Sequence, residues 1–221
     1  MDKGKKDKKD ILEVFALKIL PAFICIVIIG TSLYHHLNYS TPQGYSLGLL
    51  ALFDILIIII ISPVILHCIH YKGKVLGGLF FYASFLFMVV FENIWILMGA
   101  YHILGDAYTF NIGFLWFFHV PVNVGLGWFF FNYYGYFILS QAFPKLSQKV
   151  ICILNGLIAV SFDLWIDPTV VNSHLATGAA NFWNWDISLD PKLFTVPIYN
   201  YFGWFLGISA FTYIYASTWG E

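Results

Sequence analysis

The chain has 221 residues, of which 60% are hydrophobic, 20% are aromatic and only 10% are charged. A soluble domain carries roughly 25% charged residues, so this composition excludes a globular protein that faces water on every side. The formal net charge is −1, which offers no excess of positive charge to a nucleic acid. We therefore expect an integral protein of the cell membrane, with the lipid bilayer and no nucleic acid among its partners.

Long apolar runs without alternation predict an all-α fold, a polytopic bundle of about six transmembrane helices, and argue against a barrel. A helix that crosses the membrane needs about 20 mostly apolar residues. Six stretches meet this requirement, at about 11–33, 46–71, 75–101, 112–140, 149–167 and 193–216. The sequence thus predicts a lysine-rich tail over residues 1–10 and a single transmembrane domain over residues 11–221.

The lysines predict the orientation of the bundle, because the chain contains no arginine. Positive residues collect on the cytoplasmic side of membrane proteins. Lysines occur in the tail, between the second and third stretches, and between the fourth and fifth stretches, whereas Lys192 alone lies in a loop of the opposite set. Both termini are therefore expected to be cytoplasmic.

One phrase occurs twice in the chain. The sequences HVPVNVGLGW at 119–128 and TVPIYNYFGW at 195–204 both place Val-Pro, and then Gly-Trp, at the same spacing. An aromatic-x-aromatic triplet precedes each phrase, at 108–110 and at 183–185. A proline near the start of a span is common and interfacial aromatics are common, but their recurrence in one order indicates an internal repeat.

Each triplet is also preceded, sixteen residues earlier, by an acid, which is Glu92 in the first case and Asp167 in the second. The two predicted repeat units cover about 84–140 and 159–216. Two spans separate the copies, so both run in the same direction through the membrane. The repeat is therefore expected to be parallel, with its axis along the membrane normal.

Polar side chains within the predicted spans are candidate functional residues, because a charge inside a membrane is costly. Six of them are expected at a similar depth, near the outer side: Asp54, Glu92, Asn123, Asp163, Asp167 and Asn200. Asp163 and Asp167 are four residues apart and share one helix face. No lysine or arginine lies at this depth, so the acids are expected to keep protons near neutrality and to act as proton donors. Alternatively, Asp163 ends its helix and Asp167 faces the outer water.

Aromatic side chains surround these polar groups in the sequence. We expect a subset to wall a slot for a long, flat, apolar substrate, where ring faces can stabilise a developing carbocation. The residues concerned are Tyr108, Trp128, Trp183, Trp185 and Trp204.

The second half of the chain carries a recognisable pattern. The string Asp163-Leu-Trp-Ile-Asp167-Pro168, then Trp183-Asn-Trp185, then Phe194-Thr-Val-Pro-Ile-Tyr-Asn200-Tyr-Phe-Gly-Trp204 resembles the CruF-type carotenoid hydratases, the family of bisanhydrobacterioruberin hydratase. The first half is similar more loosely, through Glu92, Gly99, Gly105, Tyr108 and Val120-Pro121. The likeness covers about residues 90–206. Thr195 stands where that family usually has glycine, and the loop between Asp167 and Trp183 is longer.

This resemblance implies a membrane enzyme of carotenoid biosynthesis, a hydratase of the carbon–oxygen lyase type that adds water to a terminal C=C of a carotenoid or isoprenoid polyene. It implies neither a cofactor nor a metal. Other membrane enzymes of carotenoid synthesis are candidate partners. The expected catalytic residues are Glu92, Asp163, Asp167 and Asn200. The expected substrate-binding residues are Asp54, Tyr108, Asn123, Trp128, Trp183, Trp185 and Trp204.

Two other functions fit parts of the sequence. A small-solute or proton-coupled transporter is the main alternative, since carriers also combine parallel repeats with acids inside the membrane. A haem or metal protein is the other, but we interpret the histidines as interfacial side chains. The three cysteines fit no metal-ligand spacing.

Overall fold

The computed structural model describes residues 10–101, 103, 108–185 and 191–219. Most of these residues are helical, which confirms an all-α bundle of the membrane type. The helices are η1 (Phe15–Ile19), α2 (Leu20–Asn38), α3 (Leu47–Lys72), α4 (Lys74–Ala100), α5 (Val122–Ala142), α6 (Gln148–Val171), α7 (His174–Thr177) and α8 (Ile198–Trp219). The short strands are β1 (Tyr108–Phe110), β2 (Trp116–Phe117), β3 (Val120–Pro121), β4 (Trp183–Trp185), β5 (Lys192–Leu193) and β6 (Val196–Pro197). The predicted tail, apart from Asp10, and Gly105 lie outside the described residues.

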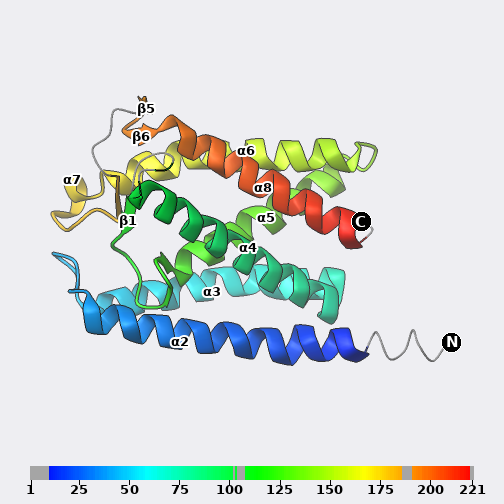
Figure 1. The fold of residues 1–221 in the computed structure, drawn as a ribbon. Coiled ribbons are helices and arrows are strands. Elements are labelled where there is room, and N and C mark those ends of the chain that lie inside the picture. Colours follow the sequence, from blue (N-terminus) through cyan, green and yellow to red (C-terminus); the bar gives the residue numbers. More distant parts are fainter. Residues whose placement is uncertain (1–9, 102, 104–107, 186–190, 220–221) are drawn as a thin grey trace.

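The long helices lie side by side, and the short strands gather at one end of the bundle (Figure 1). In this view α2 and α3 lie along one side, α6 and α8 along the opposite side, and α4 and α5 between them. The α3–α4 and α5–α6 turns lie at the other end of the bundle, where η1 begins and α8 ends.

Four helices are long and apolar enough to cross a membrane: Asp10–Asn38, Leu47–Lys72, Lys74–Ala100 and Gln148–Val171. The first includes η1 and α2. Helices α5 and α8 have 21 and 22 residues, a length of roughly 30 Å that matches the hydrocarbon core. Their many aromatic, glycine and asparagine residues make them less apolar, so the expected count of six spans stays a prediction.

The predicted start of the fourth span, near residue 112, is wrong. The strands β2 and β3 pair antiparallel there, with Trp116 opposite Pro121 and Phe117 opposite Val120. Helix α5 begins only at Val122, directly after Pro121. The apolar composition continues through this hairpin and into the helix, so hydropathy alone does not separate the two.

Small residues let the helices approach closely, as is usual in membrane bundles. A Cβ atom at Gly125 of α5 would lie 2.6 Å from side-chain atoms of both Phe85 and Val89 of α4. A Cβ atom at Gly156 of α6 would lie 2.8 Å from the carbonyl oxygen of Phe205 in α8. Close packing therefore joins α4 to α5 and α6 to α8, which are the helices that carry the candidate site.

The β2–β3 hairpin is also fastened to α2. The hydroxyl of Thr31 donates to the carbonyl oxygen of Trp116 at 2.6 Å, and the Trp116 amide donates to Ser32 Oγ at 2.8 Å. The ring of His35 stacks on that of Trp116, with centroids 3.8 Å apart. Helix α2 thus holds the loop from outside, while many of its large apolar side chains are exposed and would face lipid.

The second hairpin, β5–β6, has a two-residue turn made of Phe194 and Thr195. Both residues have positive φ angles, 52° and 74°. Such a turn matches the twist of the flanking strands and favours glycine or asparagine. A β-branched residue is strained in this region of backbone conformation, so glycine would fit the position of Thr195 better.

Replacing Thr195 with glycine is expected to raise the free energy of unfolding by about 1 kcal/mol. The change relieves the left-handed backbone, although it removes the exposed hydrogen bond, 2.9 Å long, that Asn172 donates to Thr195 Oγ1. Thermal unfolding in detergent would measure the effect. His119→Gly is the matched control, because His119 holds the same place in the first turn and has no positive φ. Lower stability in Thr195→Gly would contradict the prediction.

Candidate functional site

Glu92 of α4 lies where the strands meet the helices. One carboxyl oxygen, Oε1, accepts a hydrogen bond of 3.0 Å from the indole N–H of Trp128 in α5. The other, Oε2, accepts one from the hydroxyl of Tyr108 in β1. Both oxygens are therefore acceptors, an arrangement that suits an ionised carboxylate. Burial, and next the neighbouring Glu92, raise the pKa of the Tyr108 hydroxyl well above its usual range, so Tyr108 remains a donor.

A second acidic group lies in α6. Asp163 is fully buried and Asp167 is almost fully buried, and the two lie one turn apart on the same face of α6. The side-chain amide of Asn200 in α8 donates to Asp163 Oδ2 at 3.0 Å and also to Asp167 Oδ2. One amide therefore fixes both carboxyls, as the shared helix face of Asp163 and Asp167 suggested.

Paired aromatic rings surround these acids. The ring of Trp128 stacks on that of Trp204, with centroids 3.9 Å apart and an interplanar angle of 29°. Strands β1 and β4 pair antiparallel, which places Tyr108 opposite Trp185 and Phe110 opposite Trp183. The Tyr108 and Trp185 rings are 4.5 Å apart. The pairing of two loops distant in sequence thus completes an aromatic wall over the carboxyls.

Two small cavities lie in this cluster, and both are lined by Glu92, Trp128, Asn200 and Trp204. The larger, of about 30 Å³, is also lined by Tyr108, Phe110, Val124, Asp167, Trp183 and Trp185. This volume holds about two water molecules. Glu92 and Asp167, from different helices, therefore face one aromatic-walled space that is large enough for water.

The smaller cavity, of about 10 Å³, adds Phe91, Trp95 and Gly203 to the shared lining. Phe91 was not among the residues predicted from the sequence. Its signal is the spacing of four residues from Trp95, which puts the two rings on one helix face.

Asp54 and Asn123 were expected to bind substrate, but the structure places them apart from the acid cluster. Asp54 Oδ2 accepts from the backbone amides of Phe114 and Leu115, at 3.0 and 2.7 Å, and Oδ1 accepts from Asn123 Nδ2 at 2.7 Å. Asp54 is buried. Its contacts therefore anchor the loop that leads into the β2–β3 hairpin.

Asn93, which was not predicted as a site residue, anchors the hairpin itself. Its side-chain amide donates to the carbonyl oxygens of Val89 and Phe117, and its oxygen accepts from the amide of His119 at 3.0 Å. Glu92 is the next residue, so the same turn of α4 holds the hairpin and presents a candidate catalytic group. A buried asparagine beside an acid within an apolar helix was the available signal.

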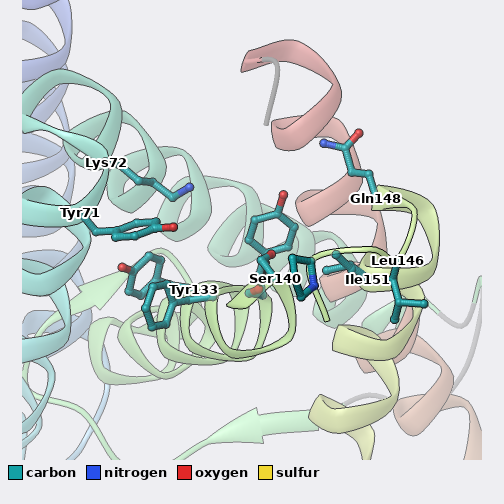
Figure 2. Close-up of a pocket in the computed structure, with 10 residues that line it drawn as sticks. Tyr71, Lys72, Tyr133, Ser140, Leu146, Gln148 and Ile151 are labelled. Atoms are coloured by element: carbon teal, nitrogen blue, oxygen red, sulfur yellow. Dashed lines mark hydrogen bonds between the residues drawn. The ribbon is translucent and has the colours of Figure 1, made fainter. Parts of the chain in front are cut away.

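A much larger cavity lies elsewhere. It has a volume of about 600 Å³ and lies at the α3–α4 end of the bundle, beside Tyr71, Lys72 and Tyr133 (Figure 2). The ammonium of Lys72 lies 5.4 Å from the ring centroid of Phe80. None of the described lining residues is acidic, so this cavity shares no group with the acid cluster. Among the residues that the structure describes, no group of three His, Cys, Asp or Glu side chains is arranged to hold a metal ion.

A bundle of membrane-type helices that encloses carboxyls beside stacked tryptophans defines a membrane protein with an acidic, aromatic-walled site. The chain matches the family described as carotenoid biosynthesis protein over residues 52–221, well over half of its length, and it belongs to that family. Every candidate site residue falls within the match. Searches among curated proteins and among solved structures found no match.

Proposed function

We propose that this protein is a membrane enzyme that adds water to a terminal C=C of a carotenoid-like polyene. The observation that carries the proposal is that Glu92 and Asp167 face one aromatic-walled cavity from two helices. An alkene that enters such a site meets a proton donor, a proton acceptor and ring faces that stabilise a cation. Membership in the carotenoid biosynthesis family supports a polyene as the substrate.

Asp167 is the proposed proton donor. The side-chain amide of Asn200 donates to an oxygen of both carboxyls, so the two acids lie close together, and two neighbouring buried carboxyls favour a proton on one of them. Asp163 is fully buried and does not line the cavity, whereas Asp167 does. Asp163 and Asn200 are thus proposed to position Asp167.

Glu92 is the proposed proton acceptor. Asp167 transfers a proton to the less substituted carbon of the terminal C=C, and the π electrons form the new C–H bond, leaving a tertiary cation on the more substituted carbon, beside Trp128 and Trp204. Water attacks this cation as Glu92 takes one of its protons, giving a tertiary alcohol. A proton then returns from Glu92 to Asp167 through water in the cavity, so the enzyme is restored and one water is consumed.

We also propose that the two predicted repeat units are copies of one ancestral unit. Both contain a helix, an aromatic strand, a hairpin and a second helix, with α7 added in the second. The β1–β4 register centres on Thr109 opposite Asn184, the middle residues of the two triplets. A two-fold axis through this point requires that pairing, and the stacking of Trp128 on Trp204 is also consistent with it.

The cytoplasmic side is proposed to be the end that carries the α3–α4 and α5–α6 turns. Lys72, Lys74, Lys145 and Lys149 belong to or flank these turns, and positive residues favour the cytoplasm. The acid cluster then lies toward the outer leaflet. Both termini are cytoplasmic in this arrangement.

Expression in a lycopene-producing bacterium tests the proposed function. The wild-type protein is expected to yield products heavier than the parent polyene by one or more waters, detected by mass spectrometry. Asp167→Asn is expected to lower the yield by about 10²-fold or more, because an amide N–H is far too weak an acid to protonate an alkene. Asp10→Asn is the control. Asp10 is exposed and begins the first helical segment, at the end of the bundle opposite the short strands. Full activity of Asp167→Asn would refute the donor role.

A further inference from the structure

Three aromatic rings form a ladder along one face of α4. The rings of Phe87 and Phe91 are nearly parallel, at 7°, with centroids 6.3 Å apart. Those of Phe91 and Trp95 lie at 22° and 5.8 Å. The residues are four apart, so the ladder follows the helix over about 12 Å. All three side chains are half-buried.

Helix α8 presents glycine to this ladder. A Cβ atom at Gly203 would lie 3.9 Å from the Trp95 ring, and one at Gly207 would lie 3.5 Å from the Phe91 ring. The smaller cavity of the site lies here, and Phe91, Trp95, Gly203 and Glu92 are among its lining residues. We call this narrow space, with two rings of the ladder on one side and the α8 backbone at Gly203 on the other, the groove.

The groove faces the side of the bundle that lipid would cover. Its flanking side chains are apolar and exposed: Ile94 is 51% and Leu97 is 41% exposed on α4, and Phe202 is 61% and Leu206 is 45% exposed on α8. Helix α8 packs much more closely on α6 than on α4. The interface between α4 and α8, here called the α4–α8 seam, is therefore less tightly packed than the interface between α6 and α8. Glu92 lies just behind this seam.

We propose that the polyene enters sideways from the bilayer through the α4–α8 seam and lies along the ladder of Phe87, Phe91 and Trp95, with its terminal double bond at Glu92. This inference rests on the proposed function. A straight, rigid conjugated chain can contact a straight row of aromatic rings along its length. The space beside Gly203 is only about 10 Å³, so entry requires the Trp95 side chain to swing outward.

Gly203 is then the residue that keeps the groove open. Gly203→Leu fills the groove and is expected to lower both bound pigment and hydrated product by about tenfold or more. Gly127→Leu is the matched control, because Gly127 precedes Trp128 as Gly203 precedes Trp204, and no atom lies within 4 Å of a Cβ built there.

The experiment uses the full chain expressed in the lycopene-producing host. Lycopene that co-purifies with the protein is measured by absorbance, and hydrated products are measured by mass. Loss of both in Gly203→Leu, with both retained in Gly127→Leu, supports the groove. Equal pigment in Gly203→Leu and wild type overturns it. If wild type binds lycopene but yields no hydrated product, the proposed hydratase activity is wrong. Loss of bound pigment in Gly203→Leu would then still support the groove.

If Gly203→Leu does not fold, Phe91→Leu replaces it, because the Phe91 ring is only half-buried. Removal of the middle ring is expected to lower bound lycopene several-fold while the thermal unfolding midpoint stays near that of wild type. Unchanged binding in Phe91→Leu would overturn the proposed path.

Discussion

Replacing Glu92 with glutamine is expected to lower hydration by about 10²- to 10⁴-fold, the usual contribution of a positioned acid or base. Glutamine has nearly the same shape and can still accept from Trp128, while the Tyr108 hydroxyl can turn to accept from its amide. It cannot take a proton from water. Yield of hydrated product per amount of folded protein, in the lycopene-producing host, measures the effect.

The same change at an exposed site provides the control. Glu13→Gln alters a solvent-exposed glutamate in the first helical segment, far from the acid cluster, and is expected to have wild-type activity. Thermal stability should not fall in Glu92→Gln, because a neutral side chain is easier to bury than a charge. Wild-type activity in Glu92→Gln would remove the proposed base, whereas a loss of activity together with unfolding would indicate a structural role.

The sequence was most informative about ionisable groups inside the membrane, where a charge is costly. An acid inside an apolar helix stands out without any structure, so Glu92, Asp163 and Asp167 could be singled out. Their approach to one another depends on the β1–β4 pairing and on the packing of α4, α5, α6 and α8. The matched spacing of the two aromatic triplets gave only an indirect sign of that pairing.

The sequence was least informative about where a polar group finds its partner. Asp54, like Glu92, lies in a strongly apolar helix and was expected to bind substrate, yet it accepts hydrogen bonds from two backbone amides of a loop about 60 residues later and from the side chain of Asn123. The first hairpin was missed for a related reason. Its turn residues, Phe118 and His119, include neither the glycine nor the asparagine that usually marks such turns, so the apolar run was interpreted as helix.

Replacing Asp54 with alanine is expected to lower the free energy of unfolding by about 3 kcal/mol or more. The change removes the acceptor of the partly buried amides of Phe114 and Leu115 and the shorter of the two hydrogen bonds that Asn123 Nδ2 donates, and each unsatisfied group costs about 1–3 kcal/mol. The loop from Phe114 then loses its attachment to α3, so the aromatic wall is also expected to loosen. Thermal unfolding in detergent measures the loss of stability.

Asp54→Asn separates anchoring from chemistry. Its amide oxygen can accept from the two backbone N–H groups, and its NH₂ can donate to Asn123 once the side-chain amide of Asn123 turns over. All three contacts survive without the charge, so stability and hydration are expected to stay near wild type. If Asp54→Asn folds normally and loses hydration, the carboxylate itself acts on substrate, as first expected. If it unfolds as readily as Asp54→Ala, the charge rather than the hydrogen-bond geometry holds the loop in place, because only the charge differs between aspartate and a correctly turned asparagine.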